Sequence, residues 1–186
     1  MAVTIDLSQV IRADSVDLEL LEWAIFKESN RQRKRLGMKP FEFEVRLQKV
    51  ARQHSGEMVE LKYFEHHSPV IKNQTIRQRV SRAGIKYGIQ GENIAIHPLN
   101  KIQEVVFSDL TPASQSATRY AWRNEGREYT YKEFSVDLVK RWLNSLPHRR
   151  NILSQQFKFL GIGCAQAQYN GLEVFYVTQN FSSTNY

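Results

Sequence analysis

The last 25 residues of the chain constrain its fold most strongly. Asn170-Gly171 separates two apolar stretches, and this dipeptide is the most characteristic turn of a two-residue β-hairpin. A turn of that length sets the register of the two strands. It pairs Gln168 with Glu173, Gln166 with Phe175, and Cys164 with Val177.

This register sorts the hairpin into two faces that can both be buried. One face carries larger apolar side chains, at Ile162, Cys164, Phe175 and Val177. The first strand of the other face carries only small residues, Gly161, Gly163, Ala165 and Ala167, which allow a helix to approach closely. A sheet covered on both faces by helices predicts an α/β (α+β) fold, a three-layer α-β-α sandwich with a small antiparallel sheet between the helices.

Four helices supply the outer layers. Ser15 is the expected N-cap of the first, which ends at Gly37. The second spans about 44–62, with apolar residues and His54 at helical spacing, and the third spans about 75–83. Thr130-x-x-Glu133 is a capping-box pattern that opens the fourth helix, which we expect to end before Pro147.

The length of 186 residues predicts one folded domain. We expect an N-terminal arm over 1–14 and a single domain over 15–186, interrupted by an insertion at about 98–129. Residues 94–96 read as a short strand that stops before Pro98. The insertion reads as loop because it contains Pro112 and a Ser/Thr/Gln stretch, although residues 105–107 are apolar enough to pair briefly.

Composition excludes several classes of protein. No apolar run approaches the roughly 18 residues of a membrane span, so we expect no transmembrane segment. The single cysteine, Cys164, rules out an internal disulfide and a cysteine-based zinc site, and it reads as a buried apolar residue. The N-terminus lacks the pattern of a signal peptide, which leaves export open because a leader can be removed.

The net charge of +7 favours anionic partners such as nucleic acid, anionic lipid or acidic polymers. The basic residues are scattered along the chain, however, so nucleic acid is the least favoured of these partners.

Polar residues that could carry chemistry concentrate in three segments, 63–69, 91–95 and 142–153. Imidazole and carboxylate groups there suit metal binding or acid–base chemistry. Composition alone favours the plainer interpretation, since most histidines are surface or core residues. His54 lies on a core-facing stripe and His97 stands beside a proline, and neither position indicates a ligand.

In order and spacing these segments resemble the CAP superfamily of cysteine-rich secretory, antigen 5 and pathogenesis-related proteins, most closely its bacterial SCP-like branch. The resemblance spans about residues 18–181. Its motifs are Ala51 to Met58, Tyr63-Phe64-x-His66-x-Ser68-Pro69, Gly91-Glu92-Asn93-Ile94-Ala95, the Trp142-to-Leu153 segment, Leu160-Gly161-Ile162-Gly163 and Val177-Thr178-Gln179-Asn180-Phe181.

The resemblance implies an α-β-α fold with a central cleft that holds two histidines and acidic residues. His66, Glu92 and His148 match the cleft positions, and the resemblance gives them as tentative catalytic residues, with His66 and His148 as tentative metal ligands. His67 and Asn93 border them. The second acid of the family has no counterpart here, because the segment after Trp142 contains none.

Three further residues accompany this cleft. Gln179 either borders it or faces Ile162 across the sheet. Arg149 and Asn151 follow His148, and we expect them to fix the loop that presents it, Arg149 by pairing with a carboxylate or capping carbonyl groups.

The residues leave two chemical alternatives open. Two imidazoles and Glu92 could hold zinc or another divalent metal with a water in the fourth position, or Glu92 could only orient one imidazole without a metal. No organic cofactor is expected. The resemblance implies a secreted or cell-envelope binding module for lipid, cell-wall polymer or protein; the alternative is a metal-dependent, peptidase-like hydrolase in the same cleft. The insertion would then form a flap or an extra packing element at one edge of the cleft.

Overall fold

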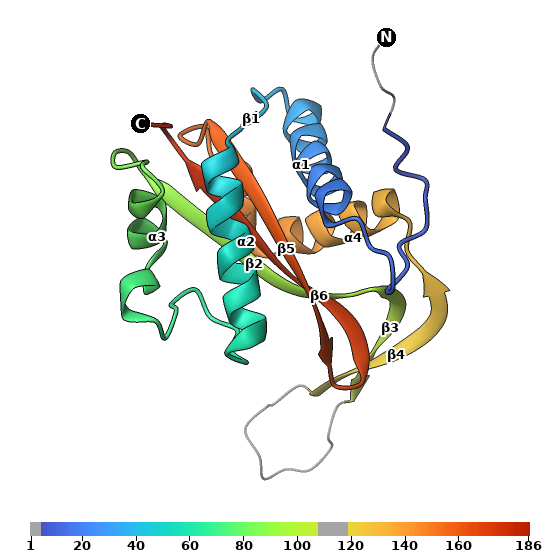
Figure 1. Cartoon of the computed structure of the whole chain (residues 1–186). Helices are drawn as coiled ribbons and strands as arrows, with labels where there is room; N and C mark the ends of the chain where they lie inside the picture. Colours follow the sequence, from blue (N-terminus) through green and yellow to red (C-terminus); the bar gives the residue numbers. More distant parts are fainter. Residues whose placement is uncertain (1–4, 108–118) are drawn as a thin grey trace, which may run out of the picture.

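The computed structural model of the chain describes residues 5–107 and 119–186, with side chains for 5–101 and 126–186. Helices and strands are interspersed along the described chain (Figure 1). In order they are α1 (Leu18–Arg35), β1 (Glu42–Phe43), α2 (Val45–Glu60), the short 3-10 turn η1 (Ile71–Asn73), α3 (Ile76–Arg82), β2 (Gln90–Pro98), β3 (Asn100–Phe107), β4 (Arg119–Glu128), α4 (Tyr131–Asn144), α5 (Leu146–Ile152), β5 (Phe159–Tyr169) and β6 (Leu172–Ser182).

The central sheet has the strand order β1-β5-β6-β2. The β5–β6 hairpin has the predicted register, with Cys164 opposite Val177 and Gln168 opposite Glu173. The strand expected at 94–96 is longer and spans all of β2, which pairs with β6 in antiparallel orientation. The expected antiparallel pairing holds for β2, β5 and β6, whereas the two-residue edge strand β1 pairs in parallel orientation, with β5.

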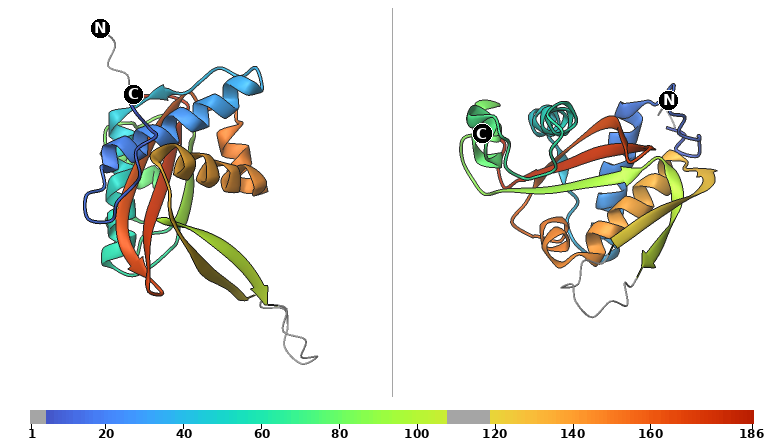
Figure 2. Two further views of the ribbon diagram at one scale, coloured as in Figure 1. Left: turned by 90° about the vertical axis from the view of Figure 1, so that its right-hand side faces the viewer. Right: turned by 90° about the horizontal axis from the view of Figure 1, so that it is seen from below.

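Helices cover both faces of this sheet, which confirms the predicted sandwich (Figure 2). On the small-residue face, α2 lies so close to β5 that a Cβ added at Gly161 or Gly163 would fall about 2 Å from the α2 backbone. On the opposite face, α1, α4 and α5 pack on the larger side chains of β5 and β6. The biggest fully buried side chains of this layer are Phe134, Trp142, Phe175 and Phe181.

The helix boundaries differ from the expected ones in two places. The N-cap of α1 is Asp17 rather than Ser15, because the Asp17 carboxylate accepts a hydrogen bond from the Leu20 amide at 2.9 Å. Pro147 does not follow the end of a helical region but lies in the first turn of α5, where a missing N–H costs nothing. The end of α1 at Gly37, with φ +69, and the capping box at Thr130 are confirmed.

The insertion is not mainly loop, since β3 and β4 form a second, two-stranded antiparallel sheet that projects from the body (Figure 2). This hairpin begins after Pro98, at the opposite end of β2 from Glu92. The six residue steps from Glu92 to Pro98 span roughly 20 Å in an extended strand. Residues 108–118, which the expected flap includes, lie outside the described part of the chain.

The N-terminal segment packs on the start of α4: Val10 pairs with Thr130, and Ile11 is fully buried. In the part of the chain that the structure describes, no helix combines the length and apolar character that a membrane crossing requires.

Candidate functional site

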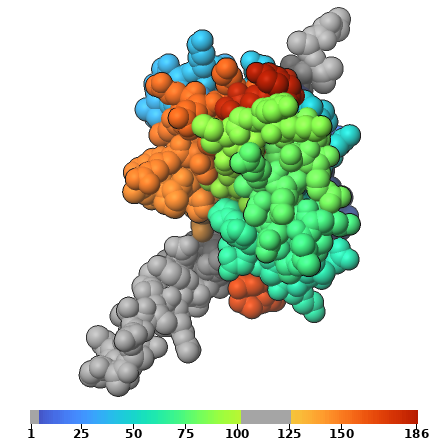
Figure 3. All heavy atoms as spheres, turned by 90° about the vertical axis from the view of Figure 1, so that its left-hand side faces the viewer, coloured from blue at the N-terminus to red at the C-terminus, as the bar shows by residue number. Residues whose placement is uncertain are grey.

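Three segments far apart in the sequence meet at the beginning of β2. They are the loop between α2 and η1, which carries His66, the strand residue Glu92, and α5, which carries His148. Figure 3 shows the face on which these segments adjoin. His66 and Glu92 are in direct contact, since His66 Nδ1 lies 3.0 Å from Glu92 Oε1. We call His66, Glu92 and His148 the His–Glu cluster.

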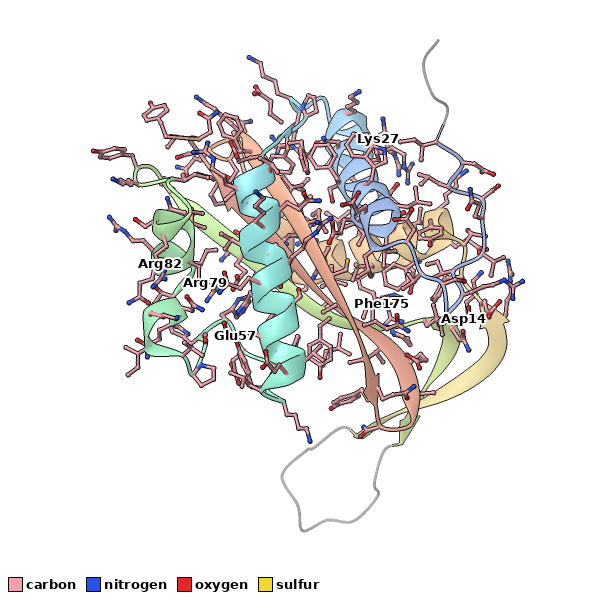
Figure 4. All side chains as sticks on the ribbon, in the orientation of Figure 1. Asp14, Lys27, Glu57, Arg79, Arg82 and Phe175 are labelled. Atoms are coloured by element: carbon pink, nitrogen blue, oxygen red, sulfur yellow. The ribbon has the colours of Figure 1, made fainter. Side chains whose placement is uncertain are left out.

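Glu92 is buried and is held by an arginine that the sequence analysis did not single out. Arg79 on α3 is itself buried, and its Nη2 lies 2.5 Å from Glu92 Oε2 (Figure 4). The other guanidinium nitrogen, Nη1, donates to the carbonyl oxygens of Asn73 at 2.9 Å and His66 at 3.2 Å. With its amide nitrogen facing the carboxylate, Asn180 donates to Glu92 Oε2 at 3.1 Å. Arg79 therefore fixes both the carboxylate and the loop that presents His66.

These contacts keep Glu92 ionised. Burial alone would raise the pKa of Glu92, but the hydrogen bond from His66 and the charge of Arg79 outweigh burial and lower it below 4.5. An ionised carboxylate accepts hydrogen bonds only, and both oxygens already have donors. Glu92 is therefore a fixed acceptor that orients other groups, and its side chain is only 3% exposed to a ligand.

The contact with Glu92 sets the tautomer of His66. Because the carboxylate can only accept, Nδ1 carries the proton and donates it to Glu92. In the neutral ring Nε2 then keeps its lone pair on the opposite edge of the imidazole. The His66 side chain is 48% exposed, so this lone pair is open to a ligand.

The second histidine is positioned through buried amides. Asn93, next to Glu92, donates to the carbonyl oxygen of His148 at 3.2 Å. Asn151, on the following turn of α5, donates to Asn93 Oδ1 at 2.8 Å and to the Glu92 carbonyl at 3.1 Å. The pKa of His148 is lowered, first by burial and then by the charge of His66.

Two of the predicted cleft residues are internal supports. Asn93 and Gln179 are fully buried, and Gln179 faces Ile162 in the sheet. Asn93 donates to Gln179 Oε1 at 3.1 Å, and Gln179 Nε2 donates to the Ser29 hydroxyl of α1 at 2.9 Å. The polar atoms of both side chains therefore form hydrogen bonds inside the protein. His67, by contrast, is exposed beside His66.

His54 also contributes to this region, from α2. It is fully buried, and its Nε2 donates to the carbonyl of Glu65 at 3.2 Å, directly before His66 in the chain. The same Nε2 lies 3.8 Å from Glu92 Oε1, and the Tyr63 hydroxyl oxygen lies 3.4 Å from Nδ1. Burial lowers the pKa of His54, so the ring is neutral. The sequence placed His54 in the core; its partners show that it also supports the His66 loop.

A loop-supporting carboxylate lies one helical turn from His54. Glu57 accepts hydrogen bonds from the Ser68 hydroxyl, from the Asn73 amide at 3.0 Å and from Tyr63 at 3.3 Å. The segment 63–73 is therefore attached to α2 before and after His66. Arg149, on α5, caps the carbonyl of Leu143 at 3.4 Å, one of the two roles expected for it.

The arrangement disfavours Glu92 as a direct metal ligand and favours its role of orienting an imidazole. Among the described residues, no three or more His, Cys, Asp or Glu side chains are grouped as ligands of one metal ion. Glu92 does not fit as a direct ligand because Arg79 and His66 occupy its oxygens. The imidazoles of His66 and His148 fit better, with Glu92 behind His66, since metal-binding histidines commonly donate their other N–H to a carboxylate.

A separate hollow of about 790 Å³ lies between α1 and α4, away from the His–Glu cluster. Its wall is mainly apolar, with Trp23, Phe26 and Phe41 among its residues. Basic side chains border it at Lys27, Arg31, Lys34 and Lys132. The sequence analysis did not predict this hollow, because it is formed by two helices more than 90 residues apart.

One signal in the sequence could have identified Arg79. It lies three residues after Ile76 and one before Val80, the two inward-facing positions of α3. A charged residue on the buried side of a helix needs a charged partner. Asn180 gave no such signal, because only the strand register brings it opposite Glu92.

Comparisons with known proteins agree with this geometry. The family model described as "CAP: Cysteine-rich secretory protein family" matches residues 26–181. The uncharacterized protein YkwD of Bacillus subtilis is 30% identical over 139 residues, which cover 75% of this chain and 40% of that protein. The chain therefore spans less than half of this curated relative.

Solved structures show the same fold. An extracellular protein containing an SCP domain from Bacillus anthracis superposes with a TM-score of 0.61 at 25% identity, covering 94% of this chain and 45% of that one. An outer surface protein of Borrelia burgdorferi superposes with a TM-score of 0.57 at 16% identity, covering 90% and 96% of the two chains.

Proposed function

This chain belongs to the cysteine-rich secretory protein (CAP) family, and from that premise we propose that it is a binding module rather than a hydrolase. The His–Glu cluster is its polar ligand site. The proposed ligand of this module is a lipid, a cell-wall polymer or a protein. Because structural relatives are described as extracellular or outer surface proteins, we also propose that this chain works outside the cytoplasm.

The observation that carries the proposal is that the buried Glu92 carboxylate already contacts Arg79 and His66. A hydrolase that used Glu92 as its base would need that carboxylate to face the attacking water. Glu92 instead is buried with a side chain 3% exposed, it contacts His66 and Arg79, and the hydrogen bond from His66 and the charge of Arg79 keep its pKa low. The segment 143–153 after Trp142 contains no second acid. The cluster is therefore better suited to holding a ligand than to transferring protons.

The ligand atoms that the cluster offers are imidazole nitrogens. His66 Nε2 is exposed, and His148 is half-buried on α5. Two imidazoles that offer lone pairs suit zinc or a related divalent ion, and Glu92 orients the His66 ring by accepting its N–H. A bound ion would supply a Lewis-acidic position for an anionic or carbonyl ligand.

Isothermal titration calorimetry with zinc tests this site. We expect one zinc per chain for the unaltered protein and loss of at least tenfold in affinity for His66→Ala and for His148→Ala. His67→Ala is the matched control, because His67 is exposed beside His66. Equal affinity in all four proteins would remove the cluster as a metal site.

Hydrolysis assays test the other half of the proposal. Zinc-loaded protein should cleave peptide and ester substrates no faster than His148→Ala protein. Turnover that depends on His148 would establish the hydrolase instead.

The hollow between α1 and α4 favours a second candidate function, binding of an amphiphile with an anionic head. Apolar walls can bury an acyl chain, at about 25 cal/mol per Å² of apolar surface, while the basic rim faces the head group. Displacement of a fluorescent fatty acid tests this function. Val136→Trp would fill part of the hollow and should weaken binding, whereas Val70→Trp, on the far side of the sheet, should not. Equal binding by both variants would refute it.

A further inference from the structure

We infer that the surface of α1 and α4 is a docking face for an anionic lipid bilayer. The inference concerns contact with a membrane surface, and it is independent of whether the His–Glu cluster binds metal. We call this surface the basic face and define it by five residues, Trp23, Lys27, Lys34, Lys132 and Lys140. Figure 2 shows α1 and α4 neighbouring each other on one side of the molecule.

The basic face is continuous over two adjoining hollows. The hollow between α1 and α4 is bordered by Lys27, Lys34 and Lys132. A second, more open hollow beside α4 is lined by Lys132 and Lys140. Because Lys132 borders both, the four lysines lie along one surface.

The carboxylates on this surface are already neutralised by other groups. Glu28 accepts hydrogen bonds from Arg31 at 2.6 Å, and Glu133 accepts them from Lys101 at 2.9 Å. Asp137 contacts His97 at 3.0 Å and Arg141 at 3.1 Å. The structure pairs none of the four lysines of the face with a carboxylate of the described residues. They are all exposed, so their charges are free to attract an anionic surface.

Apolar side chains between these lysines distinguish a bilayer from a soluble polyanion. Trp23 is half-buried at the rim, stacks on Phe26, and lies 5.6 Å beneath the Lys27 ammonium group. Leu36, two residues beyond Lys34, is 61% exposed. Tryptophan and leucine beside lysine are suited to the boundary between head groups and acyl chains. A soluble polyanion would be bound through the lysine charges alone, without these apolar side chains.

Vesicle sedimentation tests the inference. The unaltered protein should sediment with vesicles of phosphatidylcholine and phosphatidylglycerol but not with phosphatidylcholine alone. A variant with Lys27, Lys34, Lys132 and Lys140 changed to glutamine should bind several hundredfold more weakly, since each lysine near an anionic surface contributes about 1 kcal/mol, a factor of about five. The matched control changes four exposed lysines elsewhere, at positions 49, 72, 86 and 158.

The two variants lose the same charge, so the comparison separates the face from the net charge. Strong vesicle binding by the control and weak binding by the face variant would support the inference. Equal binding by the two variants, or binding to neutral vesicles, would overturn it. Retention on heparin without vesicle binding would also overturn it, in favour of a soluble polyanion. Zinc affinity should be unchanged in the face variant, so failure here is distinct from failure of the metal site.

Discussion

Replacing Arg79 by methionine tests whether the buried ion pair between Arg79 and Glu92 stabilises the site. Methionine has a similar length and keeps the apolar contacts of the side chain, but it removes the positive charge beside Glu92. The side chains of Arg79 and Glu92 are 1% and 3% exposed, so water cannot replace the lost partner. Arg79→Met therefore leaves a buried carboxylate without its counter-ion.

Breaking a buried ion pair in this way typically costs about 3–5 kcal/mol. For a chain of this length, each kcal/mol lowers the melting temperature by about 2–4 °C, so we expect a decrease of about 6–20 °C. Arg127→Met is the matched control. In its salt bridge to Glu133 the arginine is 65% and the glutamate 32% exposed, so its loss should cost less than about 1 kcal/mol.

The effect of pH has a definite sign. In the unaltered protein the pKa of Glu92 is lowered below 4.5, so Glu92 contributes stability above that pH and loses it as pH falls through the folded-state value. In Arg79→Met, burial should raise the pKa of Glu92, so stability is present at low pH and lost as pH rises. The difference in stability between the two proteins should be largest near pH 7 and shrink below about pH 4.

Urea denaturation followed by tryptophan fluorescence measures these differences. A double variant, Arg79→Met with Glu92→Met, should be more stable than Arg79→Met, because it removes the stranded charge. If Arg79→Met costs less than 1 kcal/mol, or if the double variant loses the sum of the two single effects, the two side chains do not form a coupled buried pair. The interpretation of Glu92 as a fixed acceptor would then fail.

Three further predictions concern other parts of the fold. Gly163→Ala should cost at least about 1–3 kcal/mol in urea denaturation, because its Cβ would lie 2.0 Å from the α2 backbone, whereas Gly56→Ala, with open space around it, should not destabilise the protein. The pKa of Glu133 is lowered to about 2 by the hydrogen bond from Lys101, so the stability it contributes should be lost as pH falls from 4.5 toward 2, and a Glu133→Gln variant should lack that part of the acid-unfolding profile. Asn151→Ala should lower the free energy of unfolding by about 1–3 kcal/mol, because the buried Oδ1 of Asn93 loses its donor. The same change should weaken zinc binding. Unchanged zinc affinity would show that α5 is held in place without Asn151.

The sheet and its hairpin could be predicted because the relevant signals are local. The turn at Asn170-Gly171 fixed the pairing of every residue down to Gly161, and the small residues of that strand indicated where α2 would lie. The short strand β1 was missed since two residues carry no periodic pattern. α5 was missed because Pro147 is an equally good signal for the end of one helix and the start of another.

The site was less predictable from the residues alone. Resemblance to a family supplied His66, Glu92 and His148, and the structure brings these three segments together. What surrounds them depends on packing: Arg79 comes from α3, and Asn180 comes from the strand opposite Glu92. Gln179, expected either at the cleft or across from Ile162, proved to lie across from Ile162, where its amide is satisfied internally.

The hydrogen bonds around Glu92 also explain why a binding site can be built here without a second acid. One carboxylate shared between Arg79 and His66 places a lone pair of His66 at the surface, and the amide of Asn93 places His148 beside it. A second carboxylate would be needed to accept or deliver protons, or to fix the other imidazole in the same way. His148 has instead a carbonyl held by Asn93 and a pKa lowered by burial and by His66. The lowered pKa of His148 favours its neutral ring, which is the protonation state that a metal or a hydrogen-bond donor requires of an imidazole.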